Sequence, residues 1–121
     1  MKALNNIKGV FGEKIATQFL QSRGYSIIDK NFKVKFGEID IVAIKNNVIH
    51  FIEVKSKSST LKGKPYEQVN KNKLKKIKQV SLLYSKINHL SGLKQSIDIV
   101  SILLNNDSNN HEIEMFENVT N

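Results

Sequence analysis

Two acids and a lysine interrupt apolar segments within GEIDIVAIKNNVIHFIEVKSK, residues 37–57. Asp40 lies in the first segment, and Glu53 and Lys55 lie in the second. Two carboxylates held close together can bind a hard divalent cation such as Mg²⁺, while a nearby lysine neutralises the remaining charge or orients a water molecule. These residue types indicate metal-assisted hydrolysis. The alternative is an ordinary ion pair across a surface hairpin.

The register of the two segments decides whether the acids meet. Both segments are β-prone, and Asn46-Asn47 between them predicts a two-residue turn because Asn tolerates positive φ. Continuing the ladder from this turn places Asp40 directly opposite Glu53. Opposed Cβ atoms lie about 4.5–5.5 Å apart, so two carboxylates repel each other there unless a cation lies between them.

The same register assigns the rest of the hairpin to two faces. It places Glu38 opposite Lys55, on the face of the acids. That face continues toward the turn with Val42, Ile44, Ile49 and Phe51, whereas the other face carries Ile39, Ile41, Ala43, Ile52 and Val54. Because both faces are apolar, we predict a central hairpin whose acids line a cleft, which argues against the surface ion pair.

Further elements must surround this hairpin. Apolar residues at helical spacing predict a first helix over 10–23, ended by Gly24, and a second helix from Tyr66 to Ile87. We expect strands over 25–36, 38–45, 48–55, 96–104 and 112–119, and a loop over 56–65. The order α-β-β-β-α-β-β predicts an α/β fold with a mixed central sheet flanked by helices, because a helical return from the third strand permits a parallel neighbour.

Length and composition fit a single domain over 1–121. No stretch reaches the roughly 18 apolar residues of a membrane helix and the start lacks a secretory apolar segment, so we expect a cytoplasmic protein with no membrane partner. Because the chain has no cysteine, metal ligands must be oxygen or histidine. His50, His89 and His111 lack the spacing of a metal site or a catalytic triad, and we expect His50 in the core.

Basic residues are concentrated in one part of the chain. The net charge is +8, and 18 of the 19 basic residues are lysines. Nine lysines fall between Lys55 and Lys78, against one acid, whereas the chain after Leu104 is acidic. This distribution predicts either contact with a polyanion such as nucleic acid or simply a solvated face.

Several blocks in order resemble one protein family: GEKIATQFLQSRGYSIIDKNFK at 12–33, GEIDIVA at 37–43, FIEVKSK at 51–57, YEQVNKNKLKKI at 66–77, IDIVSI at 97–102 and MFENVT at 115–120. With these blocks the chain resembles the small bacterial YraN-like proteins, the uncharacterised family UPF0102. Those proteins look like restriction endonucleases and Holliday-junction resolvases. The resemblance implies a restriction-endonuclease-like fold and the metal-dependent nuclease motif PD-(D/E)xK.

The resemblance also assigns site residues. Asp40, Glu53 and Lys55 match the acid, acid and lysine positions of the motif, and Glu13 matches an additional acid of resolvase-like members. The implied cofactor is Mg²⁺ or Mn²⁺, held by Asp40, Glu53 and the backbone carbonyl of Val54. In phosphodiester hydrolysis Lys55 would position the attacking water or stabilise negative charge. The proline of the motif's name is absent before Asp40, as is common in this family.

Three further acids have separate assignments, and only that of Glu13 is left open by the sequence. Glu13 lies at the edge of the apolar stripe of the first helix, where it either faces the cleft or is an acid favoured by the helix dipole. Glu38 is predicted to stand behind the site as a partner of Lys55. Asp98 is expected to be structural.

Lysines near the motif are predicted to contact nucleic acid: Lys33, Lys35, Lys57, Lys62, Lys64, Lys71 and Lys73. Lys73 falls on the apolar stripe of the second helix, so it either snorkels to solvent or contacts a phosphate. Lys33 and Lys57 occupy positions that are often Arg in the family, which weakens bidentate gripping of phosphates but keeps the charge.

Three functions remain open from the sequence. The first is a Mg²⁺-dependent DNA endonuclease, acting on branched or flapped DNA, alone or as a homodimer. The second is a non-catalytic nucleic-acid-binding module on the same fold. The third is a protein-interaction scaffold, which would show no salt-dependent affinity for DNA.

Overall fold

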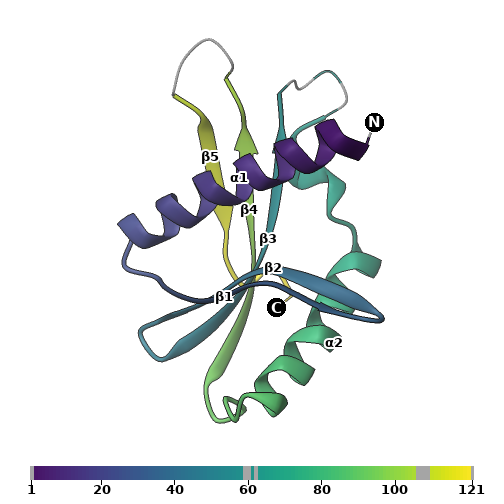
Figure 1. Ribbon diagram of the computed structural model, residues 1–121. Coiled ribbons are helices and arrows are strands. Elements are labelled where there is room, and N and C mark those ends of the chain that lie inside the picture. The colour runs from purple at the N-terminus through teal and green to yellow at the C-terminus, as the bar shows by residue number, and fades with distance from the viewer. Residues whose placement is uncertain (1, 59–60, 62, 106–109, 121) are drawn as a thin grey trace.

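The computed structural model describes residues 2–58, 61, 63–105 and 110–120, with side chains from residue 9 onward. Its elements are α1 (Lys2–Ser22), β1 (Ser26–Val34), β2 (Gly37–Lys45), β3 (Val48–Lys57), the 3₁₀ helix η1 (Pro65–Gln68), α2 (Lys71–Ile87), β4 (Lys94–Leu103) and β5 (Glu112–Phe116) (Figure 1). The predicted order of helices and strands is confirmed, with η1 as an addition.

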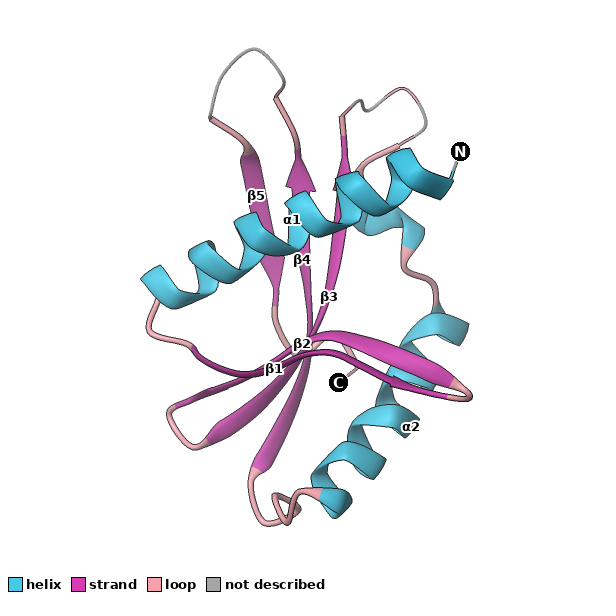
Figure 2. Cartoon of the chain, in the orientation of Figure 1, coloured by secondary structure: helices cyan, strands magenta, loops and turns pink. Residues whose placement is uncertain are grey.

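The strands form one five-stranded mixed sheet in the order β1-β2-β3-β4-β5. Strands β3 and β4 are parallel, as the helical return through α2 requires, and the other neighbours are antiparallel. The β1–β2 hairpin runs crosswise to β3, β4 and β5 (Figure 2). This strong twist carries the β1–β2 turn away from the other strands.

One helix covers each face of the sheet, and each encloses an apolar core (Figure 1). Ala16 and Leu20 of α1 pack on Ile41, Ile52 and Val100. Ile77, Val80 and Tyr84 of α2 pack on Val42, Ile49, Phe51 and Ile97. The central strands are therefore apolar on both faces, as their sequence predicts. No helix among the described residues has the length and apolar character needed to cross a membrane.

Helix α1 begins earlier than predicted, at Lys2 in place of Val10. The sequence of residues 2–9 does not predict a helix, because Asn5, Asn6 and Gly9 are weak helix formers. The predicted end is confirmed, since Gly24 has a φ of +88°.

Helix α2 begins later than predicted. Tyr66 and Val69 were expected in the helix, but Tyr66 lies in η1 and Val69 caps it. The helix starts after Asn70, whose side chain accepts a hydrogen bond from the backbone N–H of Lys73 at 2.9 Å, so an N-cap overrides the apolar periodicity. Ile87, also expected on the stripe, is 55% exposed at the end of the helix.

The β2–β3 turn is confirmed, with φ of 51° at Asn46 and 63° at Asn47. The predicted register holds from Lys45↔Val48 to Ile41↔Ile52, where the ladder ends. Beyond that point the prediction differs from the structure. Asp40 is not paired with Glu53 in the ladder, and Ile39 packs in the core against α2, not on the opposite face.

Candidate active site

Asp40 and Glu53 meet where β2 separates from β3. The Asp40 Oδ2 atom accepts a hydrogen bond from the backbone N–H of Val54 at 2.7 Å, so the side chain replaces the missing ladder contact. The Glu53 side chain hydrogen-bonds to the Asp40 carboxyl, and Glu53 is only 6% exposed. The sequence thus predicted correctly that the two acids are neighbours, although a side-chain contact brings them together in place of direct cross-strand pairing.

This contact is electrostatically costly. Burial, the charge of Asp40 and the hydrogen bond that the protonated Glu53 carboxyl donates to Asp40 raise the pKa of Glu53 to about 8. The charges of Lys73 and Lys55 oppose this shift. At neutral pH the metal-free site therefore holds a proton between its two carboxyl groups, as expected of like charges at hydrogen-bonding distance.

Two lysines approach Glu53 from different elements. The Nζ atom of Lys55, on β3, is 4.0 Å from Glu53 Oε1, and the Nζ atom of Lys73, on α2, is 3.5 Å from the same oxygen. Burial and neighbouring Lys73 lower the pKa of Lys55. Burial disfavours the charge of Lys73, but its hydrogen bond with Lys55 and the charge of Glu53 outweigh this and raise its pKa. Lys73, predicted as a nucleic-acid contact, is thus part of the site.

We expect Lys73→Met to raise the pKa of Glu53 further above 8, because the variant removes the nearest cation. Nuclear magnetic resonance of the Glu53 side-chain carboxyl carbon, followed through a pH titration, measures this directly. Lys76→Met, at an exposed position of the same helix, is the control and should leave the titration unchanged. An unchanged Glu53 pKa in Lys73→Met would show that Lys73 does not act on this carboxyl.

Glu13 comes to the site because α1 approaches β3 closely. A Cβ atom at Gly12 would lie 2.7 Å from Ser56 Oγ and 3.1 Å from Ser56 Cβ, so a larger residue there would force the Ser56 side chain to move. Glu13 is half-buried, and burial together with the charge of Asp40 raises its pKa. Of the two interpretations of Glu13, the geometry supports the one in which it faces the cleft.

Asn31 of β1 also belongs to this cluster and was missed from the sequence. Its side chain hydrogen-bonds to Glu13, and its backbone has a φ of 54°. The ladder pairs Lys30 with Ile41 and Phe32 with Ile39, which places Asn31 next to Asp40. The available signal was an Asn inside a β-prone segment, since Asn is the residue that most readily adopts this conformation.

Glu38 and the Val54 carbonyl complete the predicted set. Glu38 is exposed and pairs with Lys33 in the β1–β2 ladder, and its charge acts on Glu13. Glu38 was the predicted partner of Lys55, but the ion pair that the structure describes for Lys55 is with Glu53. The N–H and C=O of a strand residue point to the same neighbouring strand. The Val54 carbonyl therefore lies on the side of β3 where the Val54 N–H meets Asp40.

The donor set fits a hard divalent cation such as Mg²⁺ or Mn²⁺. It offers carboxylate oxygens and a backbone carbonyl, and a cation would relieve the repulsion that raises the pKa of Glu53. Among the described residues, no three or more His, Asp or Glu side chains are grouped as a metal-binding set. Water would therefore have to complete the coordination, as is usual for Mg²⁺.

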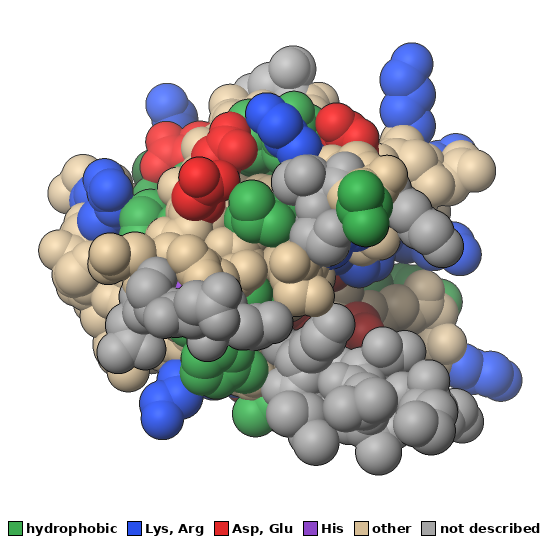
Figure 3. Space-filling model, turned by 90° about the horizontal axis from the view of Figure 1, so that it is seen from above, with side chains coloured by type: hydrophobic (Ala, Val, Ile, Leu, Met, Phe, Trp, Pro, Cys, Tyr) green, Lys and Arg blue, Asp and Glu red, His purple; other side chains and the backbone are tan. Residues whose placement is uncertain are grey.

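The predicted nucleic-acid lysines differ in their surroundings. Lys33, Lys35, Lys64 and Lys71 are exposed. Lys57 is half-buried, and its Nζ donates a hydrogen bond to a backbone carbonyl at 3.3 Å. Lys62 lies outside the described residues. Seen from above, acidic side chains lie at the bottom of a hollow and basic side chains stand near its margin (Figure 3).

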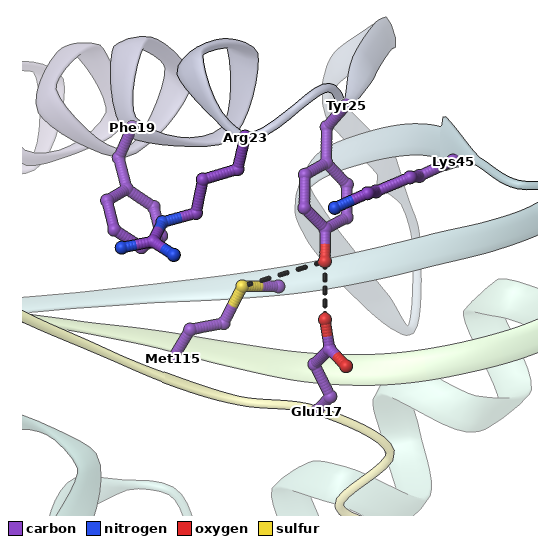
Figure 4. Close-up of a pocket in the computed structure, with 6 residues that line it drawn as sticks. All are labelled: Phe19, Arg23, Tyr25, Lys45, Met115 and Glu117. Atoms are coloured by element: carbon purple, nitrogen blue, oxygen red, sulfur yellow. Dashed lines mark hydrogen bonds between the residues drawn. The ribbon is translucent and has the colours of Figure 1, made fainter.

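A cavity of about 640 Å³ lies elsewhere, between the end of α1 and β5 (Figure 4). None of the predicted site residues lines it. Arg23 stands over the Phe19 ring and Lys45 over the Tyr25 ring, while the Tyr25 hydroxyl donates a hydrogen bond to Glu117. Burial and Glu117 raise the pKa of Tyr25, so this hydroxyl is not a ready nucleophile or base.

A buried Asp98 beside this cavity is structural, as expected. It accepts hydrogen bonds from Ser96 Oγ and the backbone N–H of Asn118, and its Oδ2 is 2.6 Å from His50 Nδ1. Because Ser96 bonds to Asp98 and not to His50, these residues do not form a nucleophilic triad. His50 is a buried core histidine, which confirms that prediction.

The sequence is similar to proteins of several organisms. The family model described as Uncharacterised protein family UPF0102 matches residues 12–102. A UPF0102 protein of Clostridium perfringens is 38% identical over 117 residues, covering 97% of this chain and 96% of the relative. Those of Syntrophomonas wolfei and Caldanaerobacter subterraneus are 37% and 41% identical, covering 93% and 87% of this chain and 100% and 87% of the relatives.

Proposed function

The chain belongs to the uncharacterised protein family UPF0102, and from its carboxylate site we propose that it is a metal-dependent endonuclease that hydrolyses phosphodiester bonds of DNA. The proposal includes a restriction-endonuclease-like fold. The support for the proposal is the placement of Asp40, Glu53 and Lys55 at the point where two central strands of a mixed sheet separate. At this point the Asp40 side chain is partly exposed, while Glu53 is buried on its strand.

The observation that carries the proposal is the contact between Asp40 and the buried Glu53. A purely structural site gains nothing from two carboxyl groups that repel each other, and their contact raises the pKa of Glu53 to about 8. Such perturbed acids are typical of functional sites. A divalent cation removes the cost, because it favours the ionised form of both groups.

The residues of the chain have distinct roles in this proposal. Asp40, Glu53 and the Val54 carbonyl would hold the cation, which supplies Lewis acidity to the scissile phosphate and lowers the pKa of water. Lys55 would donate a hydrogen bond to a phosphate oxygen and offset the negative charge that develops there. The attacking water loses a proton to solvent as its oxygen bonds to phosphorus, and the leaving oxygen takes a proton from solvent as its bond to phosphorus breaks. Lys73 holds Glu53 in place through the 3.5 Å ion pair.

DNA is the proposed substrate because the charge around the site is basic. Lys33 and Lys35 lie on the β1–β2 hairpin that carries Asp40, and Lys71 begins the helix that carries Lys73. Phosphate contacts by exposed lysines position a nucleic acid without selecting its sequence. We therefore expect affinity that falls steeply with salt.

Calorimetric titration of Mg²⁺ and Mn²⁺ tests the proposal, with cleavage of labelled linear, flapped and four-way DNA followed in parallel. Asp40→Asn should weaken metal binding about tenfold or more while an amide oxygen still accepts the Val54 N–H, so that the fold is kept. Glu114→Gln, an exposed acid on β5, is the control and should bind and cleave as wild type does. Wild-type protein that neither binds metal nor cleaves DNA would contradict the proposal.

A second candidate function is a non-catalytic DNA-binding module, which one observation favours. Lys55 and Lys73 both lie within 4.0 Å of Glu53, so two ammonium groups can neutralise the site without a metal. Salt-sensitive DNA binding with no metal uptake would support this module over the nuclease.

A further inference from the structure

The backbone of Asn31 is unusual for a strand. Five non-glycine residues among those described have positive φ, namely Asn31, Asn46, Asn47, His89 and Asn118. Of these, only Asn31 lies inside a strand. Its φ of 54° is left-handed, a conformation that persists where the surrounding structure requires it and is concentrated at functional sites.

This conformation interrupts the alternation of β1 side chains between the two faces of the sheet. Asp29 hydrogen-bonds to the Tyr84 side chain, and the Phe32 ring packs edge-on against the Tyr84 ring with centroids 4.8 Å apart. Strict alternation would place residues three positions apart on opposite faces of the sheet. The left-handed residue between them allows both to reach α2.

Strand β2 changes phase at the same level. Ile39 and Val42 pack in the same core against α2, although they too are three positions apart. Asp40 lies between them, next to Asn31 across the ladder. Both strands therefore turn at the level of Asn31 and Asp40, and β2 stops pairing with β3 just beyond Ile41.

The Asn31 side chain reaches a second acid of the cluster. It donates a hydrogen bond to the Glu13 carboxylate, and Glu13 is close enough to Asp40 for the two charges to interact. A glycine at this position would allow the same backbone conformation, but it has no side-chain amide that could donate a hydrogen bond to Glu13. An aspartate would place another negative charge beside Glu13 and Asp40.

We propose that Asn31 is a positioning residue of the site, which turns the β1–β2 hairpin at Asp40 and holds the Glu13 carboxylate beside it. The inference rests on the proposed function and deepens it, because it places the negative charge of Glu13, held by Asn31, beside Asp40 without making Glu13 a direct ligand of the cation. Asn31 itself is not a catalytic residue.

The contact is tested first in metal-free protein. In nuclear magnetic resonance spectra, Glu13→Gln should shift the side-chain amide signals of Asn31 and leave those of Asn47 unmoved. Asn47 is a matched control, because it has a φ of 63° in a turn outside the cluster. Unmoved Asn31 signals would overturn the inference whether or not the protein binds metal.

The consequence for the site is tested by calorimetric titration of Mg²⁺ into Asn31→Gly, Glu13→Gln and the double variant. Asn31→Gly should weaken Mg²⁺ binding about tenfold, and Asn47→Gly should not weaken it. Asn31→Gly should have little further effect in the Glu13→Gln background, since its effect acts through Glu13. Thermal unfolding checks that both glycine variants fold.

The outcomes separate the inference from the proposed function. Full additivity of the two substitutions, or an equal loss in Asn47→Gly, would assign Asn31 a merely structural role and overturn the inference while the nuclease stands. No Mg²⁺ or Mn²⁺ uptake by wild-type protein would overturn the proposed function and, with it, the role of Asn31 in a cation site.

Discussion

Glu53→Gln should abolish metal-dependent DNA cleavage and, at the same time, make the metal-free protein more stable at pH 8. The variant removes a carboxylate from the cation site, and we expect cleavage to fall by at least about 100-fold. It also removes an ionisable group that the fold keeps protonated against Asp40. Glutamine resembles the protonated form of Glu53, so the fold keeps its shape.

The pH dependence follows from the direction of the shift. The pKa of Glu53 is raised from 4.5 to about 8 in the folded protein, so the folded state binds the proton more tightly than the unfolded state. Its contribution to stability is fully present below pH 4.5 and is lost as the pH rises through about 8. The Glu53→Gln variant has no proton to lose at this position, so its stability advantage over wild type should reach about 4 kcal/mol at pH 8.

Urea unfolding at pH 5, 6.5 and 8, without metal, measures this difference. The advantage of the variant should be small at pH 5 and grow with pH, and Mg²⁺ should stabilise wild-type protein far more than the variant. Glu114→Gln serves again as the exposed control. A variant that is less stable than wild type at every pH would mean that Glu53 is a structural acid.

The alternating pattern and the Asn-Asn turn were sufficient to predict the central hairpin. Lys45↔Val48 and the pairs up to Ile41↔Ile52 follow from these two local signals. The prediction failed beyond Ile41, because the left-handed Asn31 lies in a third segment and changes the phase of both strands. Local alternation carries no information about such a distant effect.

The site could be predicted only in part for the same reason. Asp40, Glu53 and Lys55 share one hairpin, so their spacing predicts that they are neighbours, although the Asp40 and Glu53 side chains meet beyond the end of the ladder. Lys73 reaches Glu53 from α2 and Asn31 reaches Glu13 from β1. These contacts depend on how α1 and α2 pack on the two faces of the sheet. The sequence alone therefore leaves the contacts of Glu13 and Lys73 undetermined.

Asp98→Ala should show the opposite pattern to Glu53→Gln, a large loss of stability with cleavage retained. Asp98 is fully buried, and its removal leaves His50, Ser96 and the Asn118 N–H without their shared acceptor. Breaking a buried, hydrogen-bonded pair in this way typically costs about 3–5 kcal/mol. Urea unfolding at pH 7 measures the loss.

Asp98→Asn is the milder companion variant, because an amide oxygen still accepts the hydrogen bonds from Ser96 and Asn118, while the oxygen that faces His50 Nδ1 is replaced by an amide nitrogen. We expect it to retain a large part of the stability that Asp98→Ala loses. Both variants should cleave DNA near the wild-type rate below their unfolding midpoints, since Asp98 is outside the carboxylate cluster. A folded Asp98→Asn protein without cleavage would instead place Asp98 in the catalytic machinery. The two buried acids are thus distinguished by what surrounds them: Asp98 has hydrogen-bond donors, whereas Glu53 has another carboxyl group.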